Sequence, residues 1–178
     1  MNLANKITLI RIGFIPLFMY CFNPFPKIAI LLFLLASATD RLDGYIARKY
    51  NQVTNLGKLL DPLADKLLIS VALILMVGNH QVTAWAAFVI IGREILITAI
   101  RMLASAKGVA LQADNWGKIK LVLQVAAIAA VMIGEHMLPI IQTYYIDDIL
   151  MLLAVGLTIY SGYNYIRNNY KMLGLYYE

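Results

Sequence analysis

Long apolar runs separated by short polar breaks make up most of this chain. The breaks are rich in Gly, Pro, Asn and charged residues, which is typical of turns between helices. A membrane-spanning helix needs about 20 mostly apolar residues, and the runs are of this order of length. The pattern predicts six transmembrane helices, at residues 8–22, 27–50, 57–78, 82–106, 115–138 and 146–168, after a short N-terminal interfacial segment at residues 1–7. The expected fold class is an all-α integral membrane protein.

The composition agrees with this pattern. Charged residues make up 14 % of the 178 positions, against about 25 % in soluble proteins. The length is filled by six spans, so we expect residues 1–178 to form a single membrane domain. The basic residues behind the net charge of +5 are scattered among apolar runs. They therefore favour anionic lipid head groups over nucleic acid as partners.

The distribution of Lys and Arg predicts the orientation of these helices. If the N-terminus is cytoplasmic, the outer loops contain only Lys27. The inner segments then contain Lys6, Arg48, Lys49, Lys58, Arg101, Lys107, Lys118, Lys120, Arg167 and Lys171. Since positive charge gathers on the cytoplasmic side, both termini are expected there, in a bacterial cytoplasmic membrane.

Four aspartates stand out within residues 40–65. Asp40 and Asp43 are three positions apart, and Asp61 and Asp65 are four apart, so each pair shares one helix face. With the predicted topology, the second and third helices bring both pairs to a similar depth near the cytoplasmic face. Desolvation and like-charge repulsion both oppose ionisation of such a cluster. Something must therefore neutralise it.

A divalent metal site is the interpretation that best explains the aspartates. Carboxylate oxygens without His or Cys nearby suit Mg²⁺ or Mn²⁺. Four carboxylates could hold two ions about 3.5–4 Å apart, and magnesium often bridges to substrate phosphates. The pocket would thus suit a diphosphate substrate that faces the cytoplasm.

Two alternatives remain open for the same residues. The first is a pathway for protons or cations, as in a divalent-cation transporter, which predicts polar residues continuing toward the outer face. Residues 67–77 of the third helix, however, contain only Ser70 as a polar residue. The second is a solvated turn in which the aspartates pair with Arg41, Arg48, Lys58 and Lys66.

Small residues lie beside the aspartates. Gly44 and Ala47 leave a bare helix surface against which a flat group could pack, and Gly57 precedes Asp61 by four positions. The alternative is that they only allow close helix packing in the membrane. Pro62 is unfavourable inside a helix, so the third helix is expected either to start near Asp61 or to kink there.

Together these residues resemble the signature of the CDP-alcohol phosphatidyltransferase family. The positions are Asp40-x2-Asp43-Gly44-x2-Ala47-Arg48-x8-Gly57-x3-Asp61-x3-Asp65, and all eight match. The resemblance implies a reaction in which a CDP-linked lipid reacts with an alcohol and releases CMP. It also implies a homodimer.

The resemblance assigns roles by position. It implies that two ions of Mg²⁺ or Mn²⁺ are held by Asp40, Asp43, Asp61 and Asp65. Asp65 would also be the catalytic general base for the acceptor hydroxyl. The CDP end of the lipid would be held by Asp43, Gly44, Ala47, Arg48 and Gly57.

Basic residues outside this signature indicate the acceptor. Arg93 and Arg101 lie near one face of the fourth helix, and Arg93 is deep enough to need a partner. Glu94 is adjacent, but neighbouring residues diverge around a helix, so we expect it not to face Arg93. Arg93 could instead pair with another acid, and Arg101 could extend to the interface. Otherwise, these arginines suit a phosphorylated acceptor, because guanidinium binds phosphate bidentately.

The flanking motifs resemble the branch of the family that makes phosphatidylglycerophosphate. They are Asn5-x2-Thr8-x2-Arg11, Gly92-Arg93-Glu94-x2-Ile97-x3-Arg101 and Gly117-Lys118-x-Lys120-x3-Gln124, with Leu121 as a departure where Thr is frequent. The implied substrates are CDP-diacylglycerol and glycerol 3-phosphate, and the phosphate of the latter would be held by some of Thr8, Arg11, Arg93, Arg101 and Lys118. Serine, an inositol phosphate and phosphatidylglycerol remain alternative acceptors.

Overall fold

Helices form nearly all of the computed structural model. It describes the backbone of residues 3–49, 55–106 and 115–169, and side chains within 10–39, 66–105 and 116–169, Arg11 excepted. The elements are α1 (Leu3–Cys21), α2 (Pro26–Lys49), α3 (Asn55–Gly78), α4 (Ala84–Ala106), α5 (Asn115–His136), α6 (Ile140–Thr143) and α7 (Ile146–Asn169). The expected all-α class is confirmed for these residues.

The six expected helices correspond to α1–α5 and α7, but three details differ. Residues 3–7 are the first part of α1, so the first helix begins earlier than expected, and the interfacial position of residues 1–7 stays a prediction. The last break contains a short helix, α6, that was not predicted. Because α3 begins at Asn55, a helix start near Asp61 is excluded, and of the two alternatives for Pro62 only a kink stays a prediction.

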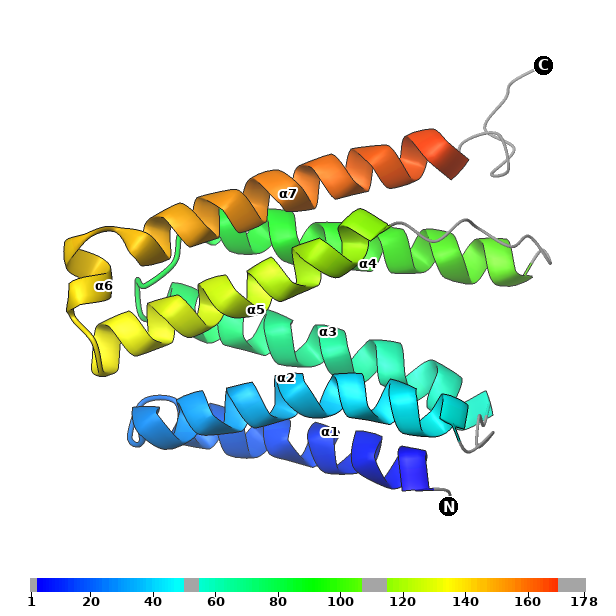
Figure 1. Ribbon diagram of the computed structural model, residues 1–178, viewed down its shortest axis with the longest axis horizontal. Coiled ribbons are helices and arrows are strands. Elements are labelled where there is room, and N and C mark those ends of the chain that lie inside the picture. Colours follow the sequence, from blue (N-terminus) through cyan, green and yellow to red (C-terminus); the bar gives the residue numbers. More distant parts are fainter. Residues whose placement is uncertain (1–2, 50–54, 107–114, 170–178) are drawn as a thin grey trace.

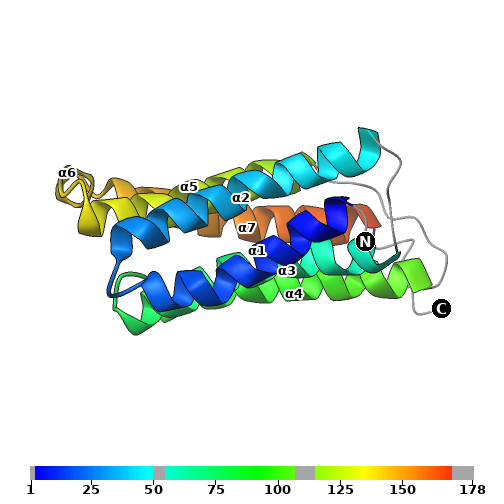
Figure 2. The same ribbon diagram turned by 90° about the horizontal axis from the view of Figure 1, so that it is seen from below.

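The long helices run up and down along one axis (Figure 1). At one end, which we call the terminal end, α1, α3 and α5 begin and α2, α4 and α7 finish. At the other, the α6 end, lie α6 and the connections from α1 to α2 and from α3 to α4. Seen from below, α2 lies along α5, and α3 lies beside α4 (Figure 2), and both pairs are in contact. These contacts bring the two signature helices against the helices that carry Arg93 and Lys120.

Small and aromatic side chains form the core. Ala29, Ala72 and Ala127 are fully buried, which lets the helix backbones approach closely. Phe18 of α1 packs against Phe33 of α2 with ring centroids 6.0 Å apart. The buried cluster draws on α1–α5 and α7, so these helices share one core.

The outer surface of the bundle is also apolar. Phe88, Leu152 and Tyr163 are more than 60 % exposed, as side chains that face lipid would be. Within the described residues, Trp116–His136 and Ile146–Asn169 are long and apolar enough to span a bilayer, and Ile12–Cys21, Pro26–Thr39 and Lys66–Gly78 form shorter apolar segments. In α4, Arg93, Glu94 and Arg101 interrupt the apolar run.

Candidate active site

The aspartates lie on the helix halves that reach the terminal end. Asp40 and Asp43 belong to the C-terminal half of α2, and Asp61 and Asp65 to the N-terminal half of α3. The two helices are in contact. The side chains of these four residues lie outside the described ones, as do those of Thr8, Arg11, Ala47 and Arg48 and the surroundings of Gly44 and Gly57.

The chemistry of the four side chains fits a hard divalent cation. They are carboxylates only, with no His or Cys in residues 40–65, and such donors suit Mg²⁺ or Mn²⁺. Among the side chains that the structure describes, no group of three His, Cys, Asp or Glu could hold a metal ion. The four aspartates remain the predicted metal ligands, and their side chains lie outside the described ones.

A cavity of about 890 Å³ opens at the opposite, α6 end. It is lined mainly by apolar side chains from the connection between α3 and α4 and from the first turns of α7. The polar side chains of His80 and Asp148 also line it. Its position excludes it as the pocket of the signature aspartates.

Arg93 and Glu94 form an ion pair, which corrects the expectation that adjacent residues could not face each other. Arg93 Nη1 lies 3.2 Å from Glu94 Oε1. Although the Cβ atoms of neighbours diverge, both side chains are long enough to curve around the helix toward each other. Lys120 of α5 also pairs with Glu94 Oε1, so the carboxylate is attracted from a second helix. The acid that partners Arg93 is therefore its own neighbour.

Among the side chains that the structure describes, this cluster contains more positive than negative charge. Lys120 is 2 % exposed, and the side chains of Arg93 and Glu94 are 12 % and 14 % exposed. Two cations thus share one carboxylate in a largely buried position. Lys66, which follows Asp65 directly on α3, also interacts electrostatically with Lys120. The excess charge is suited to an anion, and it lies close to the helix that carries Asp61 and Asp65.

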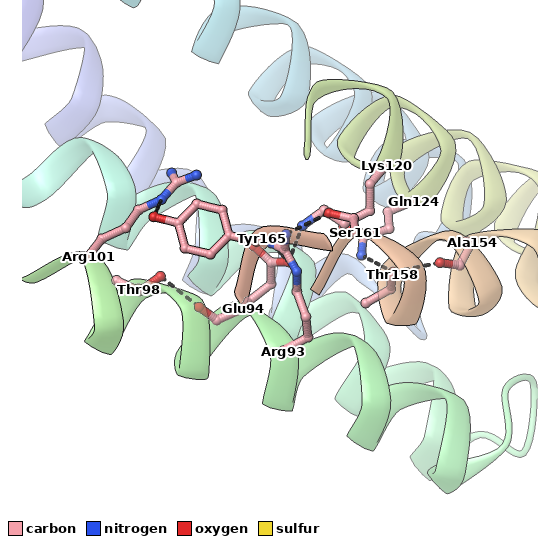
Figure 3. A network of polar contacts seen from close by, with 10 residues as sticks. All are labelled: Arg93, Glu94, Thr98, Arg101, Lys120, Gln124, Ala154, Thr158, Ser161 and Tyr165. Carbon is pink, nitrogen blue, oxygen red and sulfur yellow. Dashed lines mark hydrogen bonds and ion pairs between the residues drawn. The ribbon is translucent and has the colours of Figure 1, made fainter. Parts of the chain in front are cut away.

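Partners from α7 hold both arginines of α4 (Figure 3). Arg93 Nη2 donates a hydrogen bond to Ser161 Oγ at 2.7 Å. Arg101 Nε donates to Tyr165 Oη at 3.2 Å, and its guanidinium lies 4.9 Å from the centre of the same ring. That arrangement adds a cation–π interaction to the hydrogen bond. Arg101 is accordingly anchored on α7 rather than extended freely toward the interface.

A second polar pair joins α5 to α7 next to this cluster. Gln124 Nε2 donates to Thr158 Oγ1 at 2.8 Å, and Thr158 Oγ1 donates to the carbonyl of Ala154 at 2.5 Å. Gln124 Oε1 and Arg93 Nε are buried and have no hydrogen-bond partner among the described residues. Buried polar atoms usually have partners, so these two are candidates for ligand contacts.

Comparisons with known proteins identify the same family as the signature residues of α2 and α3. The sequence profile of the CDP-alcohol phosphatidyltransferase family matches residues 1–160. The chain belongs to this family. Three bacterial relatives share the name CDP-diacylglycerol–glycerol-3-phosphate 3-phosphatidyltransferase.

The relatives match over nearly their whole length. The Bacillus subtilis (strain 168) protein is 41 % identical over 189 aligned positions that cover 97 % of each chain. That of Rickettsia felis is 37 % identical, over 93 % of this chain and 94 % of the relative. That of Haemophilus influenzae is 35 % identical, over 93 % and 92 %.

Within this family framework, the acceptor residues expected from the sequence separate into groups. Arg93 is joined to Lys120 through Glu94, Arg101 pairs with Tyr165, and Lys118 is exposed on the surface of α5. The sequence did not lead us to predict the residues of α7 that contact these arginines, Ser161 and Tyr165. A signal for them exists, because the buried polar residues of α7 recur every three or four positions along an otherwise apolar helix, at Thr158, Ser161, Tyr165 and Asn169.

Proposed function

We propose that this protein transfers the phosphatidyl group of CDP-diacylglycerol to glycerol 3-phosphate, which yields phosphatidylglycerophosphate and CMP. The relatives that carry the name of this reaction support the proposal. The observation that carries it is the buried excess of positive charge around Arg93 and Lys120, which share one carboxylate, that of Glu94, within the described part of the chain. An acceptor with a phosphate would neutralise this charge, whereas an uncharged acceptor would not.

The diphosphate of the CDP-lipid would lie between α2 and α3. Asp40, Asp43, Asp61 and Asp65 would hold two ions of Mg²⁺ or Mn²⁺. When bound, such ions offset the charge on the diphosphate and on the leaving CMP. The CDP end would be held by residues of the signature on these helices, namely Asp43, Gly44, Ala47, Arg48 and Gly57.

Asp65 would act on the acceptor hydroxyl. It accepts the proton as the hydroxyl oxygen bonds to the phosphorus that carries diacylglycerol, and the bond from this phosphorus to CMP breaks. For this role, Asp65 needs an oxygen that is not fully engaged with metal. Asp65 lies on α3 directly before Lys66, which interacts with Lys120. The base would therefore lie beside the basic cluster that attracts the acceptor.

The acceptor phosphate would be bound from α4, with help from α1 and α5. Arg93 and Arg101 can offer guanidinium hydrogen bonds in a fixed orientation, because α7 already holds each of them. Thr8 and Arg11 of α1 and Lys118 of α5 would complete the phosphate site. Lys118 is exposed, which suits it for the first attraction of the anion.

The same proposal includes the membrane arrangement. We assign α1–α5 and α7 as six spans of a single domain over residues 1–178, with both termini and the site on the cytoplasmic side. The long helices contain 19 to 24 residues, and about 20 are needed to cross the bilayer. The excess of Lys and Arg at the terminal end supports this orientation. A homodimer is proposed from the resemblance to the family.

The first prediction tests the acceptor. Purified protein in detergent, given CDP-diacylglycerol and Mg²⁺ or Mn²⁺, should release CMP with glycerol 3-phosphate at least about 10²-fold faster than with serine, because charged groups built to bind a phosphate would remain unpaired. An inositol phosphate and phosphatidylglycerol serve as further acceptors, and removal of the metal by a chelator should stop the release.

Two results would contradict the proposal. Release of CMP with serine and not with glycerol 3-phosphate would overturn the acceptor. Movement of divalent metal across proteoliposomes, without any release of CMP, would favour a cation transporter over a transferase.

A further inference from the structure

Two adjacent residues of α7 form a seat for the side chain of Arg93. Ser161 Oγ accepts the hydrogen bond from Arg93 Nη2 at 2.7 Å. Next to it, Gly162 leaves the space that the stem of Arg93 occupies. A Cβ atom at position 162 would lie 3.2 Å from Arg93 Cγ and 3.8 Å from Nε. Both Ser161 and Gly162 are buried.

The seat leaves Arg93 little freedom. A separation of 3.2 Å is shorter than the optimum of about 3.5–4.0 Å between carbon atoms, so a methyl group at position 162 would displace the stem of the arginine. The guanidinium is also tied to Glu94, which in turn is tied to Lys120 (Figure 3). A shift of Arg93 would therefore strain or break contacts that involve three helices.

The orientation of Arg93 leaves one buried guanidinium nitrogen, Nε, without a hydrogen-bond partner among the described residues. Nη1 contacts Glu94 and Nη2 contacts Ser161. An oxygen of the acceptor phosphate would satisfy the Nε donor, and the seat on α7 determines where the donor points.

We propose that Ser161 and Gly162 are positioning residues, which orient the guanidinium of Arg93 toward the phosphate of the acceptor. The inference rests on the proposed function. It adds a contribution from α7, on which the signature has no residue. Since the seat acts through Arg93, its loss should weaken binding of the phosphorylated acceptor while leaving the handling of the CDP-lipid on α2 and α3 unchanged.

The test compares the same substitution at two positions of α7. Gly162→Ala should raise the KM for glycerol 3-phosphate about tenfold or more, with kcat and the KM for CDP-diacylglycerol within about twofold of the parent. The matched control is Gly156→Ala, because a Cβ atom there would meet nothing within 4 Å. This control should leave all three parameters unchanged. Both variants replace a helical glycine with alanine, so any general effect on helix stability is shared.

Ser161→Ala provides a second, independent variant. It removes the acceptor of one charged hydrogen bond without adding volume, and should raise the KM for glycerol 3-phosphate about three- to tenfold. A merely structural seat would lower kcat, or the amount of folded protein, without this selective change in KM. Size-exclusion profiles in detergent identify variants that fail to fold.

The outcomes separate the inference from the function on which it rests. If the parent protein releases CMP with glycerol 3-phosphate, but Gly162→Ala and Ser161→Ala have the KM of the Gly156→Ala control, the inference is wrong and the function stands. If the parent releases no CMP with glycerol 3-phosphate, both are overturned.

Discussion

Replacement of Asp65 with Asn should lower the turnover of CMP release by about 10³-fold or more, while the affinity for CDP-diacylglycerol falls much less. The amide keeps the shape and one oxygen of the side chain, so it can remain near the metal site. It cannot accept the proton of the acceptor hydroxyl. The measurement is kcat from CMP release, set beside the dissociation constant of CDP-diacylglycerol in the presence of Mg²⁺ or Mn²⁺.

The control for this variant is Asp148→Asn. Asp148 is exposed in the first turn of α7, at the α6 end, and the same chemical change there should alter turnover by less than about twofold. If Asp65→Asn lowered turnover and CDP-lipid affinity by equal factors, Asp65 would act as a metal ligand alone. Full activity of Asp65→Asn would remove it from the reaction altogether.

Replacement of Glu94 with Gln should destabilise the fold and weaken acceptor binding together. Arg93 and Lys120 both pair with this carboxylate, and Lys120 is almost fully buried. Without the charge, these two cations would lose the one anion that the described side chains place between them. We expect a loss of about 3–5 kcal/mol in the free energy of unfolding, as for other buried ion pairs that lose one partner. Unfolding in detergent and the KM for glycerol 3-phosphate measure the two effects.

Two comparisons make this prediction specific. Glu135→Gln changes an exposed glutamate of α5, whose partner Gln142 is also exposed, and should change stability by less than about 0.5 kcal/mol. The double variant Glu94→Gln with Lys120→Met removes both an anion and a cation, and should recover at least half of the lost stability, because replacing both partners of a buried pair is often neutral. If the double variant were no more stable than Glu94→Gln alone, repulsion between the cations would not be the cause.

The polar network also explains why α4 differs from the neighbouring long helices. α5 and α7 are apolar and long enough to span a bilayer, whereas Arg93, Glu94 and Arg101 interrupt α4. Each of these charges finds a partner within the described bundle: Glu94 for Arg93, Lys120 for Glu94, and Tyr165 for Arg101. Satisfied in this way, ionisable groups can remain within an apolar helix bundle, where they usually mark a functional site.

The sequence by itself determined the helices and the composition of the signature. A helix satisfies the backbone hydrogen bonds of an apolar run internally, and the six apolar runs correspond to the six long helices. The spacings of Asp40 with Asp43 and of Asp61 with Asp65 likewise follow from helix geometry alone. The sequence pattern predicted the structure less well at the N-terminus, where residues 3–7 belong to α1. It also did not predict the short helix α6 after α5. Short segments such as these depend on few local interactions, and the pattern specifies them weakly.

Only the tertiary structure decided which helices meet around the basic residues. Periodicity indicates that α7 has a polar face, but it does not say which helix that face contacts. The hydrogen bonds from Arg93 to Ser161 and from Arg101 to Tyr165 join residues 68 and 64 positions apart. The pairing of Arg93 with Glu94 likewise could not be predicted from the sequence, because Lys120 on another helix helps to set the direction of the carboxylate. Such contacts arise from packing between helices, and the spacing along one helix cannot specify them.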